Sequence, residues 1–208
     1  MADRAQILGD LTRAANDARA VAVLWHLAIT AALLTLLWGW RPSNRQAGVM
    51  LAAPIASVSV VAWAFGSPFN GVVFAALAVS LVALSLAHVP HPPTPPSHAA
   101  HVAGAIMIAF GWTYPRFVVV ASPNEYLVAA PLGLLPCPTL ALVVGFAIAA
   151  QGLGNRAWSW TLAAAAVFYA LYGSIALGVT LDALLLLGAA ALVVVTQGRR
   201  APARRVAQ

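Results

Sequence analysis

The sequence has very few charged residues and a single cysteine. Charged side chains make up 8% of its 208 residues, whereas a soluble domain usually carries about 25%. So few charges could not cover a globule in water, which excludes an ordinary soluble protein. Lysine is absent, so all eleven basic residues are arginine. The lone cysteine, Cys137, excludes an internal disulfide and a cysteine-rich zinc site.

Common signatures of catalysis are also missing. There is no phosphate-binding Gly-Lys-Ser/Thr loop, no His-Glu-x-x-His pair, no Gly-x-Ser-x-Gly turn and no pair of carboxylates within one apolar stretch. These absences favour a protein that is not an enzyme. The arginines gather in loops and in the C-terminal tail rather than on one folded face, so we expect no nucleic-acid partner.

What the sequence does have is long apolar runs. Hydrophobic residues make up 62% of the chain, and a membrane helix needs about 20 consecutive apolar residues. The pattern predicts an all-α, polytopic transmembrane helix bundle of about seven spans, or six if the fourth or seventh run does not cross. The runs are residues 21–40, 47–65, 72–87, 99–112, a fifth ending near 150, 158–177 and 183–196.

Two flanking regions complete the organisation into residues 1–20, 21–197 and 198–208. Residues 1–20 carry Ile7, Leu8 and Leu11 at helical spacing, with aspartates on another face. This pattern predicts either an amphipathic helix lying at the membrane interface or a solvated extension of the first span. Residues 21–197 form the transmembrane domain, and residues 198–208 form a basic tail.

The arginines also predict an orientation. In an inner membrane, cytoplasmic loops carry an excess of basic residues. With seven spans, a cytoplasmic C-terminus places more arginines inside than the opposite orientation does. The inside set is Arg41, Arg45, Arg156 and the four tail arginines, Arg199, Arg200, Arg204 and Arg205. We therefore expect a bacterial inner-membrane protein with its N-terminus outside.

Cys137 stands between two prolines in the apolar stretch "PLGLLPCPTLALVVGF". If Pro138 is the first helical residue, Cys137 is the N-cap and the helix begins inside the apolar region. The fifth span is then discontinuous near this point. Interrupted backbone at membrane depth must be buried in protein or line a wet cavity, and transporters often bind their substrates at such breaks. The stretch thus predicts a substrate site at Pro136, Cys137, Pro138 and Thr139, with a buried packing role for the thiol as the alternative.

Three short motifs in the C-terminal half resemble one known family. They are "TYP" at residues 113–115, "PLGLLPCPT" at 131–139 and "LGVTLD" at 177–182. Together they are similar to the signature of an uncharacterised bacterial family of multi-pass membrane proteins, a domain of unknown function. Leu132 stands where that family has an aromatic residue. The resemblance implies a multi-pass fold and no particular activity.

Four histidines surround a proline-rich loop, "HVPHPPTPPSHAAH". His88, His91, His98 and His101 form two His-x-x-His pairs, and imidazole binds zinc, copper, nickel or iron. The loop is a candidate site for a transition metal, although it also reads as a polar connection whose histidines sit at the interface.

Two other ionisable residues have local explanations. We interpret His26, in the first span, as an interfacial side chain beside Trp25. Asp182 precedes the last apolar run, where a carboxylate meets the positive end of a helix dipole.

Three functions fit these features. The first is transport or binding of a small solute or metal ion, with Cys137 as ligand or gate and Thr139 as hydroxyl donor. The second is a membrane anchor or assembly subunit, in contact with other subunits or with copies of itself as well as with the lipid bilayer. The third is a thiol-dependent oxidoreductase, against which the lack of a resolving cysteine counts.

Overall fold

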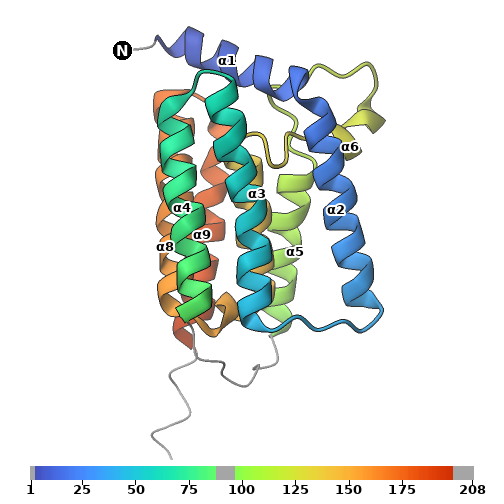
Figure 1. Cartoon of the computed structure of the whole chain (residues 1–208), viewed down its shortest axis with the longest axis vertical. Helices are drawn as coiled ribbons and strands as arrows, with labels where there is room; N and C mark the ends of the chain where they lie inside the picture. Colours follow the sequence, from blue (N-terminus) through green and yellow to red (C-terminus); the bar gives the residue numbers. More distant parts are fainter. Residues whose placement is uncertain (1–2, 88–96, 199–208) are drawn as a thin grey trace, which may run out of the picture.

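The computed structural model describes residues 3–87 and 97–198, and within these ranges it is built from helices without strands (Figure 1). The predicted all-α fold is confirmed, and each of the seven apolar runs contains a helix. These are α2 (Arg19–Leu37), α3 (Asn44–Ala64), α4 (Pro68–Ala87), α5 (His98–Trp112), α7 (Pro136–Ala149), α8 (Arg156–Leu171) and α9 (Leu184–Gln197). They run up and down the bundle, so that the N-terminal helix α1 (Arg4–Asp17) and the end of α9 lie at opposite ends.

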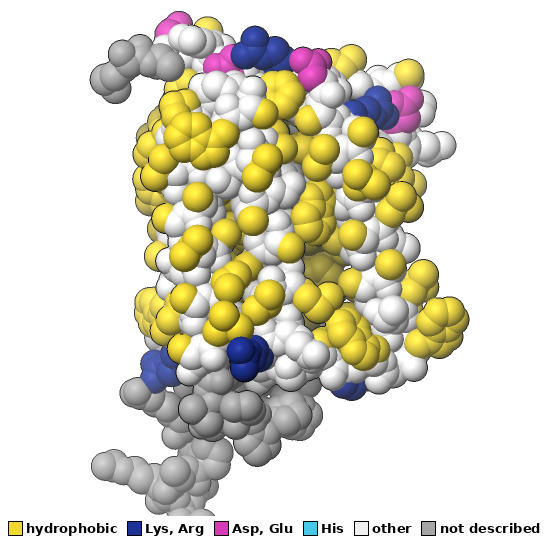
Figure 2. Space-filling view, in the orientation of Figure 1, with side chains coloured by type: hydrophobic (Ala, Val, Ile, Leu, Met, Phe, Trp, Pro, Cys, Tyr) yellow, Lys and Arg dark blue, Asp and Glu magenta, His cyan; other side chains and the backbone are white. Residues whose placement is uncertain are grey.

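Five of these helices, namely α2, α3, α4, α8 and α9 with their adjoining turns, are long and apolar enough to cross a membrane. The other two, α5 and α7, have 15 and 14 residues. Figure 2 shows apolar side chains over the middle of the bundle and charged side chains at its two ends. An apolar band between two charged ends is compatible with a membrane protein.

Polar side chains mark where three of the helices begin. Ser43 and Gln46 form a capping box, in which the Ser43 hydroxyl accepts from the Gln46 N–H and the Gln46 side chain accepts from the Ser43 N–H. Ser97 caps α5 and Asn155 caps α8 in the same way, through single hydrogen bonds. These caps satisfy N–H groups that a helix leaves without a partner at its start.

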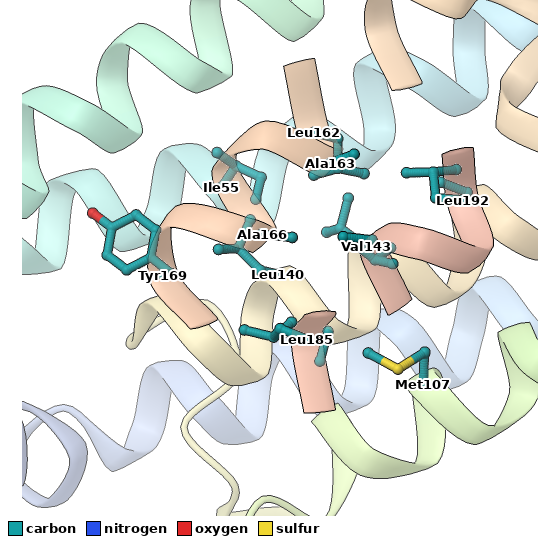
Figure 3. Close-up of a cluster of buried hydrophobic side chains, with 14 of the residues drawn as sticks. Ile55, Met107, Leu140, Val143, Leu162, Ala163, Ala166, Tyr169, Leu185 and Leu192 are labelled. Carbon is teal, nitrogen blue, oxygen red and sulfur yellow. The ribbon is translucent and has the colours of Figure 1, made fainter. Parts of the chain in front are cut away.

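The centre of the bundle is α7. Twelve of its 14 residues are buried. In Figure 3, Leu140 and Val143 of α7 lie among side chains from other helices, including Ile55, Met107 and Leu185. The helix that carries the Pro-Cys-Pro-Thr sequence is therefore surrounded by protein.

The packing of α7 against α5 is close because both helices carry glycine at the crossing. A Cβ atom added at Gly104 would lie 2.7 Å from the Gly145 carbonyl oxygen, and one at Gly111 would lie 2.6 Å from the Pro138 carbonyl oxygen. Small residues allow such close approach of backbones.

Residues 4–17 form a separate helix, α1 (Arg4–Asp17), which lies across the upper end of the bundle in Figure 1. Its Asn16 side chain donates to the Phe117 carbonyl oxygen and accepts from the Val119 N–H, each at 2.9 Å. These bonds attach α1 to the segment that follows α5. Whether this helix lies at a lipid interface, one of the two possibilities for residues 1–20, stays a prediction.

A salt bridge near the same end predicts a small pH effect. Arg19 donates to a Glu125 carboxylate oxygen at 2.6 Å, and this hydrogen bond lowers the pKa of Glu125 from its ordinary value of 4.5. The pair's contribution to stability is therefore complete above that value and is lost as the pH falls through the lowered pKa. We expect Glu125→Gln to lower the thermal unfolding midpoint slightly at neutral pH, since both side chains are partly exposed. Well below the lowered pKa the two proteins should unfold alike; an unchanged difference there would contradict this assignment.

Candidate functional site

The helix that leads to Cys137 is interrupted, as predicted. The short helix α6 (Tyr126–Ala129) ends, residues 130–135 follow without helical structure, and α7 begins at Pro136. Every residue from 129 to 145 is buried. The Thr139 hydroxyl accepts from the Gly133 N–H at 2.9 Å and donates to the Leu135 carbonyl oxygen at 2.7 Å. The break is thus shielded by protein, and its backbone groups are satisfied in part by Thr139.

The predicted position of Cys137 as N-cap is wrong by two residues. The N-cap is Leu135, whose backbone is extended, and Pro136 is the first helical residue. Cys137 is therefore the second residue of α7, and Pro138 lies in the same first turn. Both prolines are tolerated there because the first N–H groups of a helix lack partners within it.

A cluster of three polar side chains lies beside the break. The Tyr114 hydroxyl donates to a carboxylate oxygen of Asp182 at 2.6 Å, and the Cys137 side chain lines the same cavity as this carboxyl group. All three residues are buried, with exposed fractions of 0% for Tyr114, 9% for Cys137 and 3% for Asp182. They come from the "TYP", "PLGLLPCPT" and "LGVTLD" motifs, so these distant segments of sequence meet at one point.

Asp182 lies just before the last helix, as expected, but its side chain does not cap that helix. Asp182 lies in the 3₁₀ turn Thr180–Ala183, and the N-cap of α9 is Ala183, which makes no side-chain capping bond. The Asp182 side chain instead turns into the bundle toward Tyr114. Gly173 makes room for it, because a Cβ atom at this position would overlap the Asp182 carboxylate. Gly173 belongs to the π-helical turn Tyr172–Ala176 that ends α8.

A small cavity of about 30 Å³ adjoins this cluster. That volume is large enough for about one water molecule. The polar side chains of Tyr169 and Asn70 also line it, and the Tyr169 hydroxyl donates to the Asn70 side-chain oxygen at 2.9 Å. Its full lining is Ile7, Leu11, Asn70, Tyr114, Phe117, Leu135, Pro136, Cys137, Pro138, Tyr169, Tyr172, Gly173, Leu177 and Asp182. The lining thus includes one acidic side chain and no basic one.

The cavity lies under α1, because Ile7 and Leu11 of this helix contribute to its wall. Arg116 is close enough to act on Asp182 electrostatically. Among the described residues, however, the ion pairs join Arg13 to Asp10 and Arg19 to Glu125, and neither involves Asp182. The arrangement is a buried carboxyl group with a neutral hydrogen-bond donor, Tyr114, beside a space of about the size of one water molecule.

Of the four predicted substrate-binding residues, Pro136, Cys137 and Pro138 line the cavity. Thr139 does not line it, because its hydroxyl is engaged with the backbone of the break. Tyr114 and Asp182 belong to the motifs found in the sequence, yet the sequence analysis did not assign these two residues to the site. It missed Tyr169 and Asn70 altogether, since no motif or spacing singles them out.

The histidine pairs lie elsewhere. His88 and His91 are outside the described residues, whereas His98 and His101 are exposed in the first turns of α5. Cys137 lies near Tyr114, beyond the other end of α5, so about 20 Å of helix separates it from His98. Cys137 therefore does not join these histidines. In the part of the chain that the structure covers, no three His, Cys, Asp or Glu side chains are grouped to hold a metal ion; the histidine site stays a prediction.

His26 is buried within the bundle, whereas its position at a membrane interface stays a prediction. Its ring lies edge-on to Trp112, with centroids 4.7 Å apart, and its Nδ1 lies 2.8 Å from the Ala22 carbonyl oxygen. Trp25 points the other way and donates to the Ser57 hydroxyl in α3. The two neighbouring side chains thus face different helices, with His26 toward the end of α5 and Trp25 toward α3.

No family model matches the chain, and no curated protein or solved structure is significantly similar to it. The resemblance of the three motifs to an uncharacterised family therefore stays a prediction.

The position of Cys137 under α1 predicts how it reacts. We expect a small, membrane-permeant maleimide to label Cys137 slowly and an impermeant one more slowly still, because the thiol is buried. Leu11→Asp should speed labelling by about tenfold or more, since a charge against the apolar wall of the cavity disfavours docking of α1. Labelling followed by mass spectrometry measures both rates. A cysteine introduced at the exposed Val119 in a Cys137→Ala background is the reference for full access. Rapid and equal labelling of Cys137 by both reagents would contradict the burial.

Proposed function

We propose that the protein is a seven-span membrane protein that binds and transports a small cation, either the proton or a monovalent metal ion. The site is the cluster of Tyr114, Cys137 and Asp182 with the adjoining cavity. One observation carries the proposal. Asp182 is buried, its hydrogen-bond partner Tyr114 is neutral, and no basic side chain lines its cavity.

An ionised carboxylate taken out of water without a counter-charge is strongly unfavourable. Arg116 acts on Asp182 only from outside the cavity lining and forms no ion pair with it. We therefore infer that the buried Asp182 holds a proton or sits beside a cation. Ionisable groups within membrane-spanning proteins are costly and typically mark ion or proton pathways. The surrounding oxygens of Tyr114, Tyr169 and Asn70 are hard ligands of the kind that small metal ions prefer, and the cavity's volume limits the ligand to the size of about one water.

The broken helix suits this role because the backbone around it is buried and yet not fully helical. Transporters commonly bind substrates at discontinuous helices. We place the N-terminal end of the bundle outside the cell and the C-terminal end in the cytoplasm, because this orientation puts seven arginines inside and four outside. The inside set is Arg41, Arg45, Arg156 and the four arginines of the C-terminal tail. In this orientation α1 covers the site from outside.

A thiol-based reaction is less well supported. The reactive form of cysteine is the thiolate, which a neighbouring positive charge stabilises. The cavity beside Cys137 supplies a carboxyl group and no basic side chain. We therefore assign Cys137 a ligand or gating role and not a redox one.

A hydrophobic carbodiimide tests the proposal, because this reagent modifies protonated carboxyl groups in apolar surroundings. We expect it to label Asp182 in the purified protein. At fixed pH and ionic strength, the transported metal ion should protect Asp182 from labelling, with sodium, potassium and lithium compared against the bulky organic cation N-methylglucamine. If the ligand is the proton, none of them protects and labelling falls as the pH rises.

Peptide mapping provides the control within each sample. The other four acidic residues, Asp3, Asp10, Asp17 and Glu125, are partly or fully exposed and should react little with an apolar reagent. Absence of labelling at Asp182, or labelling that neither cations nor pH alters, would refute the proposed cation site.

A further inference from the structure

A second cavity lies far from Asp182, between α2 and its neighbours α3 and α7. It has a volume of about 340 Å³ and opens to the side of the bundle, where Figure 2 shows a hollow in the apolar surface. Its wall is apolar and includes Ile29 and Trp40 from the α2 side, Met50 from α3, and Leu142 and Phe146 from α7. Small side chains, such as Ala32, keep the space open.

The groove runs toward the C-terminal end of α2. Trp25 lines it nearer the N-terminal end of α2, where its indole N–H donates to the Ser57 hydroxyl at 2.9 Å and joins α2 to α3. At the other end, Leu36, Trp40 and Pro42 line it. In a bilayer such a lateral groove lies within the hydrocarbon region, and leaving it empty would forfeit van der Waals contacts along its whole wall.

The charges at this end of the groove indicate which molecule fills it. Arg41 stands between two lining residues, Trp40 and Pro42, and Arg45 follows at the start of α3; both are exposed. One Arg41 nitrogen donates to the Leu36 and Trp40 carbonyl oxygens, which positions the guanidinium at the mouth of the groove. A guanidinium has five N–H donors, so others remain for a phosphate.

No acidic side chain in the described ranges lies at this end of the bundle. Asp3, Asp10 and Asp17 lie on or beside α1, Glu125 follows α5, and Asp182 contacts Tyr114. An anion here meets only positive charge. We propose that the groove binds one anionic phospholipid, with an acyl chain against the apolar wall and the headgroup phosphate on Arg41 and Arg45. This inference does not depend on the cation site.

Native mass spectrometry of the protein released from nanodiscs tests it. Phosphatidylglycerol and phosphatidylcholine of identical chain length are compared. The wild-type protein should retain one phosphatidylglycerol in preference to phosphatidylcholine by about tenfold or more, because two arginines near one phosphate favour the anionic lipid. Arg41→Gln combined with Arg45→Gln should remove this preference. Arg156→Gln, which takes one charge from the same end away from the groove, should preserve it.

A second pair of variants tests the groove itself. Ala32→Trp fills the space and should abolish retention of either lipid, whereas Leu27→Trp on the exposed side of α2 should leave retention unchanged. Equal retention of the two lipids by the wild type, or unchanged retention in Ala32→Trp, would overturn the proposal. A dimer that Ala32→Trp dissociates would also overturn it, because a second copy of the chain would then occupy the groove.

Discussion

Gly145→Leu is expected to prevent the protein from folding. A Cβ atom at Gly145 would lie 2.7 Å from the Gly104 carbonyl oxygen and 2.7 Å from the Ile108 backbone nitrogen. Both contacts are with the backbone of α5, so no flexible side chain can move aside, and the two helices would have to separate. Because α7 is the centre of the core, this separation would disturb every neighbouring helix. We expect no monodisperse protein on size-exclusion chromatography.

A milder change at the same position keeps this prediction measurable. Gly145→Ala should lower the free energy of unfolding by about 1–3 kcal/mol, the usual cost of overpacking a core. Gly9→Ala is the matched control, since nothing lies within 4 Å of a Cβ atom there. It should leave stability unchanged or raise it by up to about 1 kcal/mol, because alanine is the better helix former. Equal stability of the two alanine variants would contradict the close contact between α5 and α7.

Gly173→Ala is expected to remove most cation binding while the bundle stays folded. The added methyl group would lie 2.8 Å from the Asp182 carboxyl carbon and would overlap one of its oxygens. The carboxyl group would have to turn away from Tyr114, and the hydrogen bond would be lost. An unpaired buried polar group costs about 1–3 kcal/mol. If this cost destabilises the state that binds the cation, the affinity falls by about tenfold to a hundredfold.

Carbodiimide labelling at Asp182, with and without the protecting cation, measures this effect, and circular dichroism checks the fold. Tyr114→Phe is the companion variant, because it removes the same hydrogen bond without adding an atom near the carboxyl group. Both variants should weaken protection by the cation or shift the pH dependence of labelling. Wild-type behaviour in Gly173→Ala would show that the position of the Asp182 carboxyl group is immaterial.

Much of the fold could be predicted from hydrophobicity alone. Apolar runs of helical length predicted the seven helices to within a few residues at most of their ends, and the prolines around Cys137 predicted the interruption before α7. Both inferences depend on local properties, namely apolar length and the backbone restrictions of proline. The start of α7 was misplaced because Pro136 and Pro138 both fit the first turn of a helix, and spacing does not distinguish them.

The site itself depends on contacts between distant segments. Asp182 precedes a helix, and the helix dipole was a sufficient local explanation for a carboxylate there. The Asp182 side chain turns inward because the π-helical turn precedes it and Gly173 leaves space for it. Tyr169 and Asn70 meet only because α8 packs against α4. Such convergence is a property of tertiary packing. The motifs around Tyr114, Cys137 and Asp182 marked the right segments without indicating that they meet.

Ion flux through Asp182→Asn proteoliposomes tests the central claim most directly. Asparagine has the size of aspartate and can still accept the hydrogen bond from Tyr114, but it cannot carry a negative charge or hold an exchangeable acidic proton. The transported ion is the proton or the metal ion that protects Asp182 from labelling. Vesicles with wild-type protein should show a flux of this ion well above that of protein-free vesicles. Proton flux is followed with a trapped pH-sensitive dye under an imposed potential. The Asp182→Asn protein, equally folded and equally reconstituted, should not exceed those vesicles. Equal flux through both proteins, or none through the wild type for any of these ions, would contradict the account.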